Sequence, residues 1–215
     1  NDQVEGYKNS IDQLANMHIN NYFFYDVYNT PANPFPANVE RFTQDWATFL
    51  IPNNETDPDK RKSYLPVIDT EAVKELVAHV HTTGAKAMLY NMIYAVSLEE
   101  GVPNEVKSAI VRNLQDHFNF GKKGDVTATD IQQFLDPGDP NWQRFIIEVM
   151  TKAMKEGNFD GWQGDTMGSN WVEKVSEPGK GFSLSEHYPE LATAATEALK
   201  KEGYDFMIND ISTGD

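Results

Sequence analysis

Acidic, amide and tyrosine side chains gather where the predicted strands of this sequence end. They are Asp26, Tyr28 and Asn29 after the first strand, Tyr90, Asn91 and Tyr94 after the second, Asp136 after the third, Gln163 and Asp165 after the fourth, and Asn209 and Asp210 after the fifth. Because the carboxyl ends of parallel strands converge on one face, we expect these groups to lie together. Aromatic faces beside acids and amides suit the binding of neutral sugars. A single aromatic such as Tyr90 or Trp162 is more simply explained as core, but the whole set favours a binding cleft.

The spacing of two aspartates in the run 159–168 (FDGWQGDTMG) separates their roles. Five positions of extended strand divide Asp160 from Asp165, which corresponds to roughly 16 Å and turns the two side chains to opposite faces. Only Asp165 can therefore reach a pocket at the carboxyl end of the strand, and Asp160 is predicted to anchor the turn before it. The structural alternative for Asp165 is a capping residue before Thr166.

The elements that would position these groups alternate between helices and short apolar runs, which indicates a parallel α/β fold. Strands are predicted at 19–25, 85–90, 131–135, 159–165 and 204–209, and helices at about 6–18, 70–83, 140–157 and 191–199. The third strand is the weakest of the five. Long connections at 31–64 and 94–127 are expected to be functional loops, because structureless loops of this length are uncommon in compact domains.

The number of strands limits the architecture. Five strand–helix steps use nearly all of the 215 residues, whereas a closed (β/α)8 barrel needs eight strands and typically ~250 residues. A barrel would therefore be present only in part, with apolar edges at its first and last strands that favour dimerisation or aggregation. An open doubly wound sheet would be complete, but residues 26–31 (DVYNTP) lack the glycine-rich phosphate turn of that fold, so nucleotide binding is unsupported.

The amino-acid composition limits the classes of partner that the protein could bind. With 18 Lys and Arg against 33 Asp and Glu, the net charge of −15 disfavours nucleic acid and anionic membranes. The longest apolar runs, such as 144–154, fall short of the ~20 residues of a membrane span. The absence of cysteine excludes disulfides and thiolate chemistry, and the five histidines show no metal-ligand spacing. We therefore expect no metal and no cofactor.

Three segments together resemble glycoside hydrolase family 66. They are 159–168 (FDGWQGDTMG), 24–29 (FYDVYN) and 89–94 (LYNMIY). The family contains endo-dextranases and cycloisomaltooligosaccharide glucanotransferases, and the Trp-Gln-Gly-Asp-Thr form is more similar to the dextranase branch. The resemblance extends from about residue 11 to residue 210. It implies that residues 1–215 are the amino-terminal part of a (β/α)8 TIM-barrel catalytic domain and hold its first five strands.

The resemblance also implies an activity: endo-hydrolysis of α-1,6 linkages in dextran with retention of configuration, with Asp165 as the nucleophile. Retention needs a second carboxyl group roughly 5–5.5 Å away as acid and base, which in the family is a glutamate from a later strand, beyond this chain. Glu173, Glu177 and Glu186 are more simply surface residues, so the chain alone is expected to be nearly inactive. Strand-end position and family likeness together assign sugar contacts to Asp26, Tyr28, Tyr90, Asn91, Trp162, Gln163 and Asn209.

Two alternatives stay open, a glucanotransferase that forms cyclic isomaltooligosaccharides and a non-catalytic glucan-binding module. In each case the expected partner is an α-glucan such as dextran or an isomaltooligosaccharide. The family further implies an extracellular, cell-surface or periplasmic location, although residue 1 onward shows no signal-peptide pattern.

Overall fold

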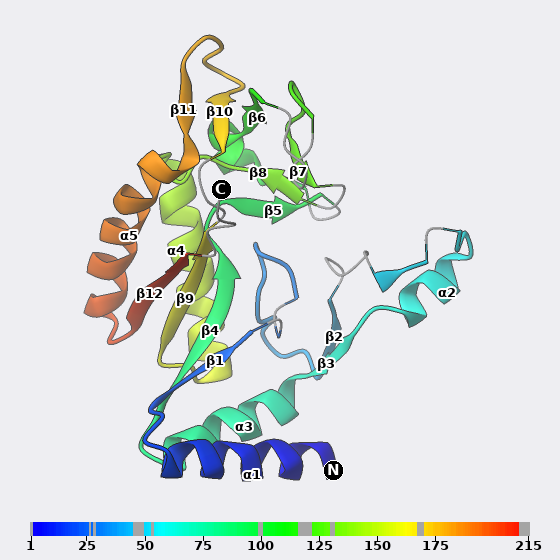
Figure 1. The fold of residues 1–215 in the computed structure, drawn as a ribbon, viewed down its shortest axis with the longest axis vertical. Helices are drawn as coiled ribbons and strands as arrows, with labels where there is room; N and C mark the ends of the chain where they lie inside the picture. Colours follow the sequence, from blue (N-terminus) through cyan, green and yellow to red (C-terminus); the bar gives the residue numbers. More distant parts are fainter. Residues whose placement is uncertain are drawn as a thin grey trace.

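A computed structural model gives the structure of the chain. It describes residues 2–25, 27, 29–44, 50–52, 54–98, 101–115, 122–129, 132–166 and 170–210. Within these residues the central sheet has four parallel strands in the order β1-β4-β9-β12 (Figure 1). The strands are β1 (Asn21–Phe24), β4 (Lys86–Met92), β9 (Gly161–Thr166) and β12 (Asp205–Asp210).

Helices connect the successive parallel strands. They are α3 (Thr70–Thr82) between β1 and β4, α4 (Pro140–Gly157) between β4 and β9, and α5 (Leu184–Lys201) between β9 and β12. A further helix, α1 (Asp2–Asn16), precedes β1 and packs on α3. The helix starts follow local capping rules, since Asp69 accepts a hydrogen bond from Ala72 N at 3.1 Å and Asp139 accepts one from Asn141 N at 2.9 Å.

The core lies between the sheet and the helices. Six consecutive residues of β4 after Lys86 are buried, so this strand is covered on both faces, as parallel strands usually are. The helices contribute their apolar faces to one continuous cluster, which includes Val77, Val80, Ile146, Met150, Leu191 and Leu199. The predicted parallel α/β class is therefore confirmed.

Two small antiparallel sheets lie beyond the carboxyl ends of β4 and β9 (Figure 1). One consists of β5 (Ala95–Ser97), β8 (Gln132–Phe134) and β7 (Thr127–Thr129), and the other of β11 (Gly181–Ser183), β10 (Trp171–Lys174) and β6 (Val111–Asn113). A 3-10 helix, η2 (Asn104–Ala109), precedes β6.

These sheets correct the predicted strand count. The segment 131–135 was predicted to be the third parallel strand, but β8 pairs antiparallel with β5 on one side and with β7 on the other. Its backbone groups are therefore used outside the central sheet, and the next strand to pair with β4 is β9, which follows α4. The described residues hold four strands of the parallel sheet rather than five.

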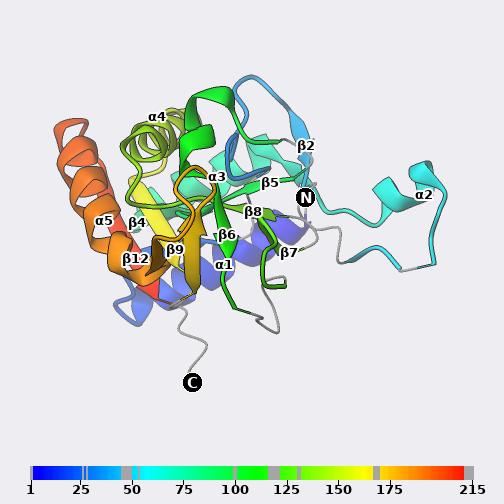
Figure 2. The same cartoon turned by 90° about the horizontal axis from the view of Figure 1, so that it is seen from above.

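The predicted loop 31–64 also contains short elements. An antiparallel pair forms from β2 (Arg41–Thr43) and β3 (Val67–Asp69), and α2 (Pro58–Ser63) lies between them in sequence. Viewed from above, α2 stands on an arm that extends away from the sheet and its helices (Figure 2). None of its residues is buried, so this arm contributes little to the core.

At the amino-terminal end of the sheet, Asp160 anchors β9 as predicted. Its Oδ2 accepts a hydrogen bond from Ala87 N at 2.7 Å and lies 2.8 Å from His81 Nε2 of α3. One carboxylate thus links β4, β9 and α3.

No helix in the described residues has the length and hydropathy that crossing a membrane would require.

Candidate active site at the carboxyl end of the sheet

Asp165 lies near the carboxyl end of β9, with only 5% of the residue exposed. The strand continues through Thr166, so Asp165 is a strand residue and the helix-cap alternative is wrong. Its register partners are Met92 of β4 and Asn209 of β12. The strands on both sides of β9 therefore bring their own carboxyl ends to this residue.

Tyr90 joins Asp165 from the neighbouring strand. Its hydroxyl donates a hydrogen bond to Asp165 Oδ2 at 2.5 Å, and both side chains are buried. The contact fixes the orientation of the carboxylate. A hydrogen bond to a charged acceptor is roughly twice as strong as one between neutral groups.

Tyr25 extends this pair toward solvent. Its ring centroid lies 4.0 Å from that of Tyr90, and nearly half of Tyr25 is exposed. Tyr25 ends the predicted first strand 19–25, so it was not among the polar residues named after that strand. Its position directly after β1 and before Asp26 is the signal that would have included it among the strand-end residues.

Gln163 shares the face of β9 that carries Asp165, because residues two apart in a strand point to the same side. It is buried, it stands in register with Tyr90, and its Oε1 has no hydrogen-bond partner among the described residues. A buried amide oxygen without a partner is costly, so a hydroxyl or water at this position would satisfy it.

Asn91 and Trp162 occupy the opposite face of the sheet. Asn91 Nδ2 donates to Pro31 O at 2.8 Å, and Trp162 Nε1 donates to Asn91 O at 3.3 Å; both residues are fully buried. The structure does not bring these two predicted sugar contacts to Asp165. The reason is strand alternation, which turns them away from Tyr90 and Gln163.

The other predicted contacts are described only in part or not at all. Asp26 and Tyr28 lie outside the described residues. Asn209 is known by its backbone, which is in register with Asp165 in β12. These three assignments stay predictions.

The glutamates after Asp165 have structural contacts. Glu173 was predicted to be a surface residue, but it is buried: its Oε1 lies 3.3 Å from Arg112 Nε and its Oε2 accepts from Gly179 N at 2.6 Å. Glu177 pairs with Lys180 on the surface, and Glu186 completes the capping box of α5. The Glu173 prediction failed because Arg112 comes from β6, far away in sequence.

A charged cluster near the first turn of α4 holds β10 and α5 together. Lys174 Nζ lies 2.9 Å from Asp139 Oδ2 and 3.2 Å from Asp136 Oδ2, while His187 Nδ1 lies 2.6 Å from Asp136 Oδ1. Burial alone would raise the pKa of Asp139, but hydrogen bonds from Lys174 and from Asn141 N outweigh it and lower that pKa. Burial opposes the charge of Lys174 as well, yet the two aspartates raise its pKa. We call these four side chains the Lys174 cluster.

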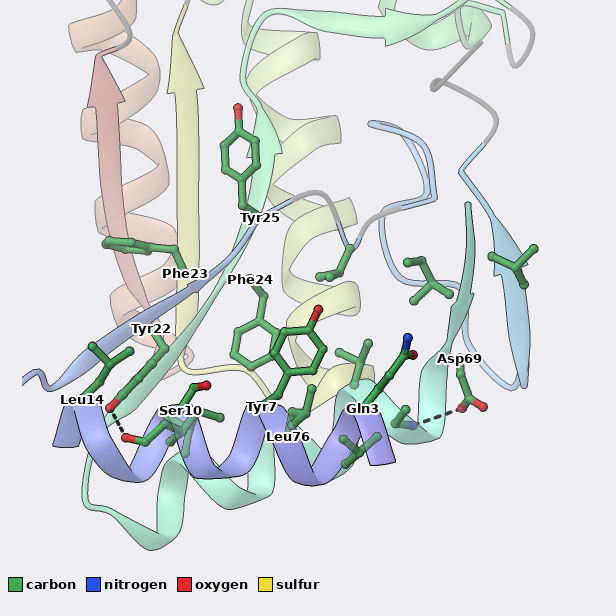
Figure 3. A pocket seen from close by; sticks show the side chains of 18 of the residues that line it. Gln3, Tyr7, Ser10, Leu14, Tyr22, Phe23, Phe24, Tyr25, Asp69 and Leu76 are labelled. Atoms are coloured by element: carbon green, nitrogen blue, oxygen red, sulfur yellow. Dashed lines mark hydrogen bonds between the residues drawn. The ribbon is translucent and has the colours of Figure 1, made fainter. Parts of the chain in front are cut away.

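One hollow in the structure is lined by Tyr25 but not by Asp165. It measures about 610 Å³ and lies between α1, the edge strand β1, and α3 with β3 (Figure 3). Its lining is mostly apolar and includes Tyr7, Leu14, Phe23, Phe24 and Leu76. The groove follows the free edge of β1.

Across the described residues, no three His, Cys, Asp or Glu side chains come together as a possible metal site.

The parallel α/β fold is similar to that of two solved structures. A noncanonic maltogenic α-amylase from Thermotoga neapolitana superposes with a TM-score of 0.50 at 13% identity, over 95% of this chain and 41% of the amylase chain. A cycloisomaltooligosaccharide glucanotransferase from Paenibacillus sp., solved with cycloisomaltoheptaose, superposes with a TM-score of 0.72 at 19% identity, over 96% of this chain and 28% of that chain. At these identities the likeness establishes the fold.

The sequence establishes the family. The model of glycosyl hydrolase family 66 matches residues 1–214, and a dextranase from Streptococcus salivarius is 37% identical over 98% of this chain. The chain belongs to glycosyl hydrolase family 66. It spans about a quarter of the length of the dextranase.

Proposed function

We propose that the whole protein containing this chain hydrolyses α-1,6-linked glucan, with Asp165 as the nucleophile of a retaining double displacement. The observation that carries the proposal is the buried Asp165 carboxylate at the carboxyl end of β9, oriented by the Tyr90 hydroxyl. The Trp-Gln-Gly-Asp-Thr segment and the 37% identity to a dextranase favour hydrolysis of dextran over cyclisation.

In this mechanism the Asp165 carboxylate attacks the anomeric carbon of an α-linked glucose and forms a β-glucosyl-enzyme. A carboxylic acid protonates the departing glucan oxygen and then, as carboxylate, activates the water that releases an α-configured product. Tyr90 keeps the attacking carboxylate aligned, which reduces the reorganisation needed to reach the transition state. The Gln163 amide oxygen lies on the same face of β9 as Asp165 and would accept a hydrogen bond from a sugar hydroxyl.

The proposal includes the rest of the domain. We propose that residues 1–215 are the amino-terminal part of a (β/α)8 barrel and that further strands and helices cover the free edges of β1 and β12. Phe23 on β1 and Met207 on β12 are 47% and 42% exposed, and the 610 Å³ groove runs along β1. The acid/base glutamate would come from a later strand. We further propose the extracellular, cell-surface or periplasmic location that the family resemblance implies.

The test is to trap the covalent intermediate in the intact protein. A 2-deoxy-2-fluoro glucoside with a good leaving group slows the second step, so a glucosyl adduct should accumulate on the peptide that contains Asp165. Proton NMR of the first product from isomaltooligosaccharides should show the α-anomer. An adduct on another carboxylate would overturn the assignment, and dextran binding without turnover would favour a glucan-binding module.

Replacing Tyr90 by Phe is expected to lower kcat on dextran roughly 10- to 100-fold. The substitution removes a hydrogen bond to a charged group, worth about 1.5–3 kcal/mol, but keeps the ring beside Tyr25. Initial rates on dextran should show the loss mainly in kcat, with a small change in KM and in the melting temperature. An unchanged kcat would mean that Tyr90 does not orient the reacting carboxylate.

A further inference from the structure

Trp171 differs in exposure from the other tryptophans that the structure describes. Trp142 and Trp162 are fully buried, whereas Trp171 is 44% exposed. It is the first residue of β10 and follows Asp165 by six positions in the chain. The β10–β11 hairpin lies beyond the carboxyl end of β9 (Figure 1), and Trp171 begins this hairpin, so the residue lies at the same end of the sheet as Asp165.

Gly181 gives the Trp171 indole its position. A Cβ atom at Gly181 would lie 2.9 Å from Trp171 Nε1, 3.1 Å from Cε2 and 2.7 Å from Leu114 Cδ1. Such separations are shorter than van der Waals contact, so the indole occupies space that only glycine leaves open. The pyrrole side of the ring is thus backed by β11, while nearly half of the residue stays accessible.

The hairpin that carries Trp171 is held by buried polar contacts. Glu173 is in register with Gly181 on one side and Arg112 on the other. Its carboxylate pairs with Arg112 and accepts the Gly179 N–H in the β10–β11 turn. Trp171 O accepts a hydrogen bond from Leu114 N at 2.9 Å. The backbone around the indole is therefore fixed before any ligand arrives, which lowers the entropy cost of binding.

We propose that Trp171 is a stacking platform for a glucose ring of an α-glucan chain that extends beyond the cleavage point. The inference rests on the proposed function for its ligand. An aromatic face carries negative charge density and attracts the polarised C–H groups on the flat side of a pyranose. A glucan is neutral, so the net charge of −15 does not oppose it. On this proposal, long glucan chains should contact Trp171 and short ones should not.

The platform can be tested in the intact protein with dextran and isomaltotriose as substrates. Trp171→Ala should raise KM for dextran about three- to ten-fold, the range expected for an aromatic contact, and leave kcat and the isomaltotriose kinetics within about two-fold. Trp171→Phe should retain most of the affinity for dextran. The dependence on chain length is the readout that a merely structural role would not produce.

Gly181→Ala is the matched variant, because it keeps the indole and displaces it. It should raise KM for dextran in the same direction, and the Trp171→Ala/Gly181→Ala double variant should be no worse than Trp171→Ala alone. Three results would each overturn the platform. The first is an equal loss of activity on dextran and isomaltotriose in Trp171→Ala, and the second is a KM for dextran in Trp171→Ala equal to that of the wild type. The third is a double variant in which the effects of the two substitutions on KM add. If the wild-type protein neither binds nor cleaves dextran, the proposed function itself fails, and the ligand assigned to Trp171 fails with it.

Discussion

Replacing Asp165 by Asn in the intact protein is expected to lower kcat on dextran by about 10⁴-fold or more. The amide has nearly the shape of the carboxylate, so Tyr90 can still donate to its oxygen and the buried site should stay packed. What is lost is the nucleophile, and removal of a nucleophile from a catalytic unit typically costs several powers of ten. At 1.36 kcal/mol per tenfold change, the loss corresponds to about 5 kcal/mol of transition-state stabilisation. Initial rates and a melting curve measure the two effects separately.

Asp160→Asn is the control on the same strand. Asp160 lies at the amino-terminal end of β9 and forms hydrogen bonds with Ala87 N and His81, so its substitution should lower stability and leave kcat nearly unchanged.

A second experiment, with azide, distinguishes a carboxylate that acts as the nucleophile from one that acts as the acid/base. With an activated α-glucoside, Asp165→Ala plus azide should give the β-glucosyl azide, because azide replaces the nucleophile. An α-glucosyl azide would identify Asp165 as the acid/base instead.

Local signals in the sequence predicted the starts of α3 and α4, but α5 begins at Leu184 rather than at residue 191, and α2 lies within the predicted loop 31–64. Asp69 and Asp139 stand where N-caps are expected, and Asp139 is followed by Pro140 at the start of α4. The strands with continuous apolar runs, such as β4, were also found. The weak strand at 131–135 was placed in the wrong sheet, because its pairing with β5 depends on residues far away in sequence, and an apolar run does not show whether a strand pairs parallel or antiparallel.

Part of the candidate site followed from strand alternation alone. The rule that separated Asp160 from Asp165 also separates Gln163 from Trp162, and Tyr90 from Asn91, so the structural positions of Trp162 and Asn91 could have been predicted from β9 and β4. The Tyr90–Asp165 contact could not, because it depends on the register between the two strands. Register is set by packing across the sheet, which no single strand encodes.

Replacing Lys174 by Met is expected to destabilise the domain by about 3–5 kcal/mol, the usual cost of removing one partner from a buried ion pair. Met keeps most of the aliphatic stem, while Asp136 and Asp139 lose the ammonium group that lies within 3.2 Å of both. For a domain of this size the melting temperature should fall by about 10 °C. Calorimetry of the intact protein measures the shift, and Asp139→Asn/Lys174→Met, which keeps a capping side chain at α4, should recover part of it.

The pKa shifts of Asp139 and Lys174 determine how the stability effect of Lys174→Met should change with pH. The lowered pKa of Asp139 means that its contribution is present above the unfolded value of 3.8 and is lost as pH falls through the folded pKa. The raised pKa of Lys174 means that its contribution is present below 10.5 and is lost as pH rises through the folded pKa. Without Lys174, the hydrogen bond and the charge with which it lowers the pKa of Asp139 are lost, so that pKa should rise and acid should relieve part of the unpaired charge. The deficit of Lys174→Met should therefore be smaller near pH 4.5 than near pH 7. A deficit that stays constant over this range would show that Lys174 stabilises the fold through its packing rather than its charge.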